Sequence, residues 1–344
     1  MKPVLKVCLN RRRFHTITRV IGMIALFAVV CSASPHDPAP IGRMIDIGGR
    51  KVHIHCTGRG RPTVVVENGG AAFSFDWEFV QPQVARFTRI CTYDRAGYAW
   101  SDAGPHFDTF DQAAHDLHLL LARADVPGPY VLVGHSLGGM LIRFYQAKYP
   151  KDVVGMVLVD SSHEQSLQRV GPKMVRIPEL TAEQFHALID EGKTNRPKNA
   201  EPNLAPTTIF PPYDRLPAKL QNLHLWALKK VLPLVESWGL NLQFDLSRLH
   251  QLRVASPHPL GNMPLEVLTA SQFDVVSAPG ITFEQARRDH LRLQNDLTQL
   301  SANSRHITVS GSGHEIYLYQ PGAVVRSISA VVISVKNHSP LSPR

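Results

Sequence analysis

Hydrophobic and polar positions follow two rhythms along most of the chain, and together they predict an α/β fold. Short runs of β-branched and apolar residues are typical of buried strands, and an apolar residue every three or four positions is typical of an amphipathic helix. The predicted strands cover residues 51–56, 63–67, 88–93, 130–133, 153–159, 265–270 and 306–310. The predicted helices cover residues 77–85, 110–123, 138–149, 283–300 and 323–335. Fully apolar strands that alternate with helices favour a mostly parallel sheet covered on both faces.

The alternation stops between residues 161 and 262. This stretch is rich in Pro, Leu and charged residues and has helical patches but no strong strand; Thr181 and Gln184 have the spacing of a capping box. Sheets of this kind carry their sites at the carboxyl ends of the strands, so an insertion after the strand 153–159 should cover that edge. We therefore expect a helical cap at 161–262.

The first 33 residues have the pattern of an export signal. They contain six Lys or Arg residues and no acidic residue, and an apolar run from Val20 to Val30 is followed by small residues. A run of this length is typical of a signal peptide and is short for a membrane span. We expect cleavage near Ser34 and a periplasmic or secreted protein, with an uncleaved membrane anchor as the alternative.

The rest of the chain then divides into three further parts around the cap. Residues 34–160 and 263–336 should form the two portions of the core, and residues 337–344 should form a short C-terminal tail.

Composition and charge limit the classes of binding partner that are expected. Of the 344 residues, 44% are hydrophobic and 19% are charged, as in globular proteins. The formal net charge is +9, but without residues 1–33 there are 31 basic and 28 acidic residues. No basic stripe with interleaved aromatic residues follows, which argues against a nucleic-acid partner. Membrane contact is expected only through the N-terminal segment.

A nucleophile is predicted at Gly134-His135-Ser136-Leu137-Gly138, which matches G-x-S-x-G. The motif directly follows the apolar strand 130–133 and opens a helix, which is the context in which a tight turn lifts a serine hydroxyl clear of a sheet. Gly134 and Gly138 would let the strand and helix approach. A glycine-rich turn without chemistry is the alternative interpretation.

A serine hydroxyl needs a base, and the best candidate is His314. It follows the last predicted strand in the run Gly311-Ser312-Gly313-His314, which puts it at the carboxyl edge of the sheet, whereas His306 begins that strand and should lie at the opposite edge. Two carboxylates could orient this base. Asp160 directly ends the strand 153–159, and Asp274 lies four residues beyond the strand 265–270. We favour Asp160 and keep Asp274 as the alternative.

These motifs resemble the α/β-hydrolase superfamily. The elbow at Ser136, the loop Asn68-Gly69-Gly70-Ala71, the C-terminal Gly313-His314 and the stretch 93–101 (YDRAGYAWS) carry the resemblance, which covers about residues 43–336 except the cap. It implies an eight-stranded sheet whose second strand is antiparallel, and no cofactor. It also implies an oxyanion hole made by the backbone amides of Leu137 and Gly70. The chain has Asn68-Gly69 where His-Gly is common.

The strand order that the resemblance implies also predicts a disulfide. The second strand should lie antiparallel beside the fourth, so Cys56 at the end of one would face Cys91 near the start of the other. Export to an oxidising compartment agrees with such a bond. Two buried free cysteines are the alternative. Asp94 and Arg95 are interpreted as structural, bracing the loop after the fourth strand.

The sequence therefore predicts a serine hydrolase, most simply an ester hydrolase for small uncharged or apolar esters. An acyltransferase with the same triad and a non-catalytic binding module are the alternatives. Dehalogenases and epoxide hydrolases of this fold use an aspartate at the elbow, which Ser136 replaces. His53 and His55 share a strand face, and His115 and His118 share a helix face. Without a metal-binding motif, we interpret all four as surface or hydrogen-bonded histidines and expect no metal.

Overall fold

The computed structural model describes residues 37–105, 109–170, 173–194, 206–235, 242–272 and 281–342. The chain divides into two compact units, Met1–Asp37 and Pro38–Arg344, and the description below concerns the second. The predicted signal segment, residues 1–33, and the alternative acid Asp274 lie outside the described residues. Among the described helices, none has the length and apolarity needed to cross a membrane.

In the described part, eight strands form one sheet in the order β1-β2-β4-β3-β5-β6-β9-β10. Their bounds are β1 Arg43–Asp46, β2 Lys51–Thr57, β3 Thr63–Glu67, β4 Ile90–Tyr93, β5 Tyr130–His135, β6 Val153–Val159, β9 Leu265–Ala270 and β10 Ser304–Val309. β2 is antiparallel to β1 and β4, and the other pairs are parallel. The sheet class and the antiparallel second strand are confirmed.

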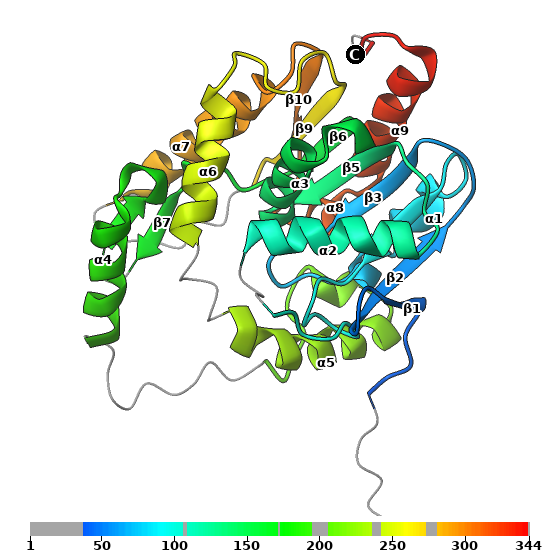
Figure 1. Cartoon of the computed structure of the whole chain (residues 1–344), viewed down its shortest axis with the longest axis horizontal. Helices are drawn as coiled ribbons and strands as arrows, with labels where there is room; N and C mark the ends of the chain where they lie inside the picture. The colour runs from blue at the N-terminus through cyan, green and yellow to red at the C-terminus, as the bar shows by residue number, and fades with distance from the viewer. Residues whose placement is uncertain are drawn as a thin grey trace, which may run out of the picture. The chain divides into compact units, whose positions relative to one another are not determined.

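Helices cover both faces of the sheet (Figure 1). Their bounds are η1 Ser74–Trp77, α1 Gln81–Val84, α2 Phe110–Arg123, α3 Leu137–Lys148, η2 Pro150–Asp152, α7 Phe283–Thr298, α8 Ile316–Tyr319 and α9 Pro321–Asn337. The central strands alternate between two apolar cores: Val65 and Leu132 pack with α2 and α3, and Val64 and Val133 pack with α8 and α9. Burial on both faces explains why these strands are continuously apolar.

The segment between β6 and β9 contains more than the predicted helices. It holds η3 Ile177–Glu179, α4 Ala182–Thr194, η4 Tyr213–Arg215, α5 Ala218–Val235 and α6 Leu242–Val254, together with the hairpin β7 Leu167–Val170 and β8 Lys173–Arg176. The sequence indicated no strong strand in this insertion, and the hairpin is a short addition to the predicted helices. Half of its residues are polar and it is only partly buried, so it lacks the apolar alternation that marks a strand.

The predicted capping box is present at the start of α4. The backbone N–H of Gln184 donates to Oγ1 of Thr181 over 3.2 Å, and the backbone N–H of Thr181 donates to Oε1 of Gln184 over 2.9 Å. Two amide groups that the first helical turn leaves without backbone acceptors are thereby satisfied.

A disulfide joins β2 to β4. Cys56 and Cys91 are directly opposed in the antiparallel register, with their Cα atoms 4.0 Å apart and their sulfur atoms bonded. This is the pair that the strand order predicted. The bond closes a loop of 35 residues that includes all of β3, and it joins two strands that are neighbours in the sheet.

Candidate active site

Ser136 occupies the sharp turn between β5 and α3. Its backbone has φ 52° and ψ −122°, a conformation that a residue with a side chain rarely adopts. The flanking glycines make the turn possible: a Cβ on Gly134 would lie 2.6 Å from the carbonyl oxygen of Gly138, and a Cβ on Gly138 would lie 2.3 Å from that of Glu67. Gly134 and Gly138 thus let β5 and α3 approach each other, as the sequence predicted.

His314 and Asp160 are brought together at the same edge of the sheet. Nδ1 of His314 lies 2.6 Å from Oδ2 of Asp160. The carboxylate is buried, with 2% of its side chain exposed, whereas 42% of the His314 side chain is exposed. Asp160 follows β6 and is held there by its own backbone N–H, which donates to the carbonyl oxygen of Leu268 on β9 over 2.7 Å.

The electrostatics of Asp160 favour its charged form. Burial alone would raise the pKa of this carboxyl, but hydrogen bonds from His290 and His314 and the charges of both rings outweigh burial and hold the pKa well below its usual range. A carboxylate that stays ionised can orient a histidine through Nδ1 and stabilise its charged form.

The turn of Ser136 is tied to the turn that carries the acid. The backbone N–H of Ser136 donates to the carbonyl oxygen of Val159 over 3.2 Å, and that of Ser162 donates to the carbonyl oxygen of Ser136 over 2.9 Å. Oγ of Ser136 and Oγ of Ser162 are 3.5 Å apart. The ends of β5 and β6 therefore fix Ser136 and Asp160 relative to one another.

His135 links the turn of Ser136 to the loop that carries His314. The sequence did not reveal this role, because His135 stands at a variable position of the G-x-S-x-G motif. Its Nε2–H donates to the carbonyl oxygen of His314 over 3.1 Å, and the two rings are 4.6 Å apart. Burial, followed by the charge of His314, lowers the pKa of His135 to about 3. His135 is thus neutral near pH 7 and donates from Nε2.

Arg95 holds the loop after β3, which carries Gly70, through hydrogen bonds. Its guanidinium donates to the carbonyl oxygens of Asn68 and Gly69, each over 2.6 Å, and to Oε1 of Glu67 over 2.6 Å. The sequence interpretation of Arg95 as a structural residue placed its brace on the loop after the fourth strand. The structure instead puts the guanidinium on the loop after β3, because the end of β4 lies beside β3 in the sheet.

Further contacts fix the same loop close to the nucleophile. The Tyr98 hydroxyl donates to the carbonyl oxygen of Gly70, and Nε1 of Trp77 donates to Oδ1 of Asn68 over 2.8 Å. A Cβ on Gly69 would lie 2.7 Å from Nδ1 of His135 and 3.3 Å from Cβ of Ser136, so only glycine fits there. The loop predicted to supply an oxyanion donor thus approaches Ser136 at its backbone.

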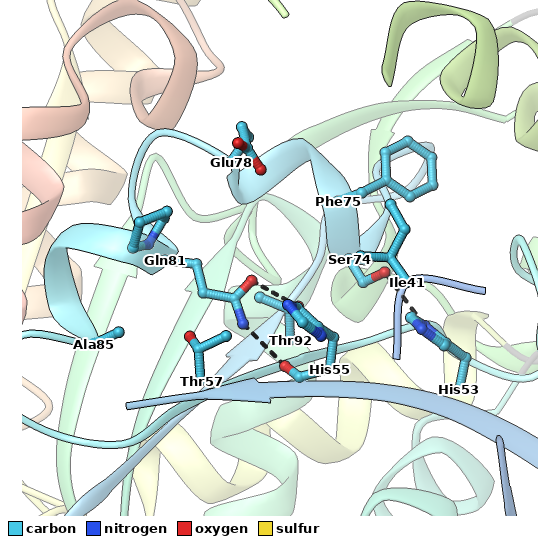
Figure 2. Close-up of a pocket in the computed structure, with 11 residues that line it drawn as sticks. Ile41, His53, His55, Thr57, Ser74, Phe75, Glu78, Gln81, Ala85 and Thr92 are labelled. Atoms are coloured by element: carbon cyan, nitrogen blue, oxygen red, sulfur yellow. Dashed lines mark hydrogen bonds between the residues drawn. The ribbon is translucent and has the colours of Figure 1, made fainter. Parts of the chain in front are cut away.

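A separate cavity of about 330 Å³ is lined by residues of β2, η1, α1 and β4 (Figure 2). His53, His55, Gln81 and Thr92 line it, and no triad candidate does. Gln81 joins the carbonyl oxygen of His55 to the hydroxyl of Thr92, and Nδ1 of His53 lies 2.7 Å from Oδ2 of Asp94. Among the described residues, no three His, Cys, Asp or Glu side chains are grouped to hold a metal ion.

Comparison with known proteins agrees with this architecture. The profile of the alpha/beta hydrolase family matches residues 52–327. An AB hydrolase superfamily protein of Gibberella zeae is 24% identical over 289 residues, covering 80% of this chain and 88% of that protein. Against the first curated relatives, the chain spans less than half of the relative's own length, 19% of one and 46% of the next.

Solved structures show the same fold. A putative lipase from Acinetobacter baumannii has a TM-score of 0.58 at 18% identity, over 86% of this chain and 92% of that one. An esterase from Thermogutta terrifontis has a TM-score of 0.55 at 19% identity, over 83% of this chain and 94% of that one. With most of its length matched by the family profile, the chain belongs to the alpha/beta hydrolase family.

Proposed function

We propose that this protein is a serine hydrolase that cleaves carboxylic esters with Ser136 as nucleophile, His314 as base and Asp160 as the acid of the triad. The observation that carries the proposal is the contact of 2.6 Å between Nδ1 of His314 and Oδ2 of Asp160, at the strand edge that also holds the elbow of Ser136. Asp274, outside the described residues, is the alternative acid.

The contact at Nδ1 determines which nitrogen of His314 acts. Nδ1–H donates to the carboxylate, so Nε2 is the nitrogen with a free lone pair in the neutral ring. Nε2 takes the proton of the Ser136 hydroxyl as Oγ attacks the ester carbonyl. It then returns the proton to the departing alkoxide oxygen, leaving an acyl-enzyme. Water attacks the acyl-enzyme with the same base, and the acid product leaves.

The negative oxygen of each tetrahedral intermediate is assigned to the backbone amides of Gly70 and Leu137. Leu137 follows the nucleophile at the first residue of α3, and Gly70 lies in the braced loop after β3. Each such donor is worth about 2.7–4 kcal/mol in the transition state. Support comes from the close approach of Gly69 to Cβ of Ser136.

The substrate is proposed to be a small ester that is uncharged or apolar. The lipase and the esterase among the similar structures support an ester as the substrate class. The apolar residues of the insertion give this substrate class little support. Phe185, Leu188 and Leu223 are buried within the hydrophobic cores, so they are committed to packing rather than to a substrate surface.

Labelling with a fluorophosphonate probe tests the reaction class, because the probe reacts with an activated serine. We expect one label per chain on Ser136, and a protein that stays unlabelled while folded would support a binding module. A panel of aryl esters of increasing acyl length then measures the substrate range. Adding an alcohol acceptor separates hydrolysis from acyl transfer, since a transferase would form the new ester in preference to the acid.

We also propose that the protein is exported and that its mature chain begins near Ser34. The basic and apolar pattern of residues 1–33 supports export. The disulfide between Cys56 and Cys91 also agrees with an oxidising compartment. Mass spectrometry of the protein recovered from the cell envelope and medium tests this, since an intact Met1 would favour the membrane-anchor alternative.

A further inference from the structure

The carboxylate of Asp160 is contacted by a second histidine, His290. Nε2 of His290 lies 3.3 Å from Oδ1 of Asp160, and the backbone N–H of Ala270 donates to the same oxygen over 2.9 Å. His314 contacts the other oxygen, Oδ2. The two oxygens are therefore divided between partners: Oδ1 faces the body of the protein and Oδ2 faces the proposed base.

His290 comes from α7, and the same helix also contacts the residue after Asp160. Gln294 lies one turn after His290 on the same helix face. Its Nε2 donates to the carbonyl oxygen of Ser161 over 2.6 Å, and its Oε1 accepts from the Thr269 hydroxyl over 3.4 Å. Gln294 is 1% exposed. One face of α7 thus clamps two successive residues of the turn that carries the acid.

This turn needs such a clamp. Asp160 has φ 40°, in the left-handed region that residues with a side chain seldom adopt, so contacts with the surroundings must hold it. The carboxylate can also rotate about its terminal torsion, which is soft, and rotation would withdraw Oδ2 from His314. Donors on Oδ1 oppose that rotation because it would break their hydrogen bonds inside a buried site.

We propose that His290 is a positioning residue of the triad: donating from Nε2 to Oδ1, it fixes Oδ2 of Asp160 against His314. This inference rests on the function proposed above. The hydrogen bond also draws charge from the carboxylate, so Asp160 attracts a proton on His314 less strongly than it otherwise would. His290 therefore keeps His314 available as a base to a lower pH. Among the described residues, His306 on β10 and His135, which contacts His314, are titratable groups that adjoin this arrangement.

Two substitutions separate the hydrogen bond from the bulk of the side chain. His290→Gln keeps an amide donor at the position of Nε2, whereas His290→Met keeps a similar length and removes the donor. For Met we expect kcat to fall roughly tenfold with little change in KM, the scale of one hydrogen bond to a charged group. We also expect the acidic limb of the kcat/KM profile to move to higher pH by about half a unit. Gln should restore both quantities close to wild type.

His306→Gln is the matched control. His306 is also a histidine close to His290, but its Nε2 contacts Oγ1 of Thr269 and not the carboxylate. Its kcat and acidic limb should match those of the wild type. Asp160→Asn in the same assay separates the two proposals: full activity in Asp160→Asn would overturn the triad itself. If Asp160→Asn is inactive while His290→Met keeps the wild-type rate and pH profile, only the positioning role is wrong. Equal losses in Met and Gln with an unmoved acidic limb would likewise overturn it, since α7 packing alone would explain them.

Discussion

Nδ1 of His314 lies 2.6 Å from Oδ2 of Asp160, although 154 positions separate the two residues in the chain. Between them the chain forms the whole insertion, β9, α7 and β10 before it returns to the same edge. The contact forms because β6, β9 and β10 are parallel neighbours, so their carboxyl ends meet. The proposed chemistry thus depends on sheet order, and local sequence supplies only the residue types.

Ser136→Ala should abolish ester hydrolysis and leave the fold intact. The fold should stay intact because only the hydroxyl group is removed. Loss of the nucleophile in a triad lowers the rate by several orders of magnitude. Steady-state hydrolysis of an aryl ester and circular dichroism check the two halves of this prediction. His314→Ala should lose activity to nearly the same extent because the pair acts as a unit. Retention of a tenth of wild-type activity in Ser136→Ala would remove this residue from the mechanism.

Asp160→Asn should lower kcat by about 10⁴-fold, whereas Asp274→Asn should stay near the wild-type rate. The amide can no longer fix the Nδ1–H tautomer of His314 or stabilise its charge, which is the basis of losses of this size. The two variants serve as mutual controls, since each changes one carboxylate to an amide of the same size. A large loss in Asp274→Asn with an active Asp160→Asn would exchange the two assignments.

Tyr98→Phe should reduce kcat by roughly tenfold, because the hydroxyl that fixes the carbonyl group of Gly70 is lost and the oxyanion donor becomes less well held. Tyr130→Phe is the matched control: its hydroxyl donates to the carbonyl oxygen of Val126 over 2.7 Å, at the end of β5 opposite to Ser136. Both variants should unfold at similar denaturant concentrations. Equal kcat values for the two would contradict a catalytic role for the Gly70 loop.

Acid should destabilise the protein partly through His135. Its pKa is lowered to about 3 in the fold, mainly by burial, whereas the free side chain titrates near 6.5. Between these values the unfolded chain binds a proton that the folded chain does not, so stability falls as pH falls from about 6.5 towards 3. The loss should reach about 2 kcal/mol by pH 5. Denaturant unfolding at several pH values gives the free energy of unfolding as a function of pH. This free energy should fall less steeply with falling pH in His135→Gln than in wild type, while exposed His115→Asn should keep the wild-type dependence on pH.

The sheet was predictable from sequence because its strands are buried on both faces. β3, β6 and β9 have the predicted bounds, since their largely β-branched and apolar runs favour a buried strand. β1 and the β7–β8 hairpin were not separately predicted: they are short, partly exposed and polar. α6 lies within the insertion that was predicted to be helical, but its bounds were not predicted, because it buries only a few residues, including Leu246 and Leu249, and its other positions are largely polar.

The candidate site divides in the same way. Ser136 and His314 could be proposed from the sequence because each lies in a glycine-rich turn directly after a predicted strand. His290 was not, because its partner lies 130 positions away and nothing around it in the sequence marks a function. The brace from Arg95 to Asn68 and Gly69 depends on β4 lying beside β3, which becomes visible only in the assembled sheet.

The disulfide between Cys56 and Cys91 should contribute to stability through the 35-residue loop that it closes. Loop-closure entropy for this length gives about 3–4 kcal/mol. Cys56→Ala, Cys91→Ala and the double variant should then lose nearly the same free energy of unfolding, because either single substitution already breaks the bond. Additive losses would instead indicate two separately packed thiols. Thiol counting on the unfolded, unreduced mature protein provides an independent measurement, with no free thiol expected. Two free thiols per mature chain would contradict the bond, and under reducing conditions the wild type should unfold at the denaturant concentration of the double variant.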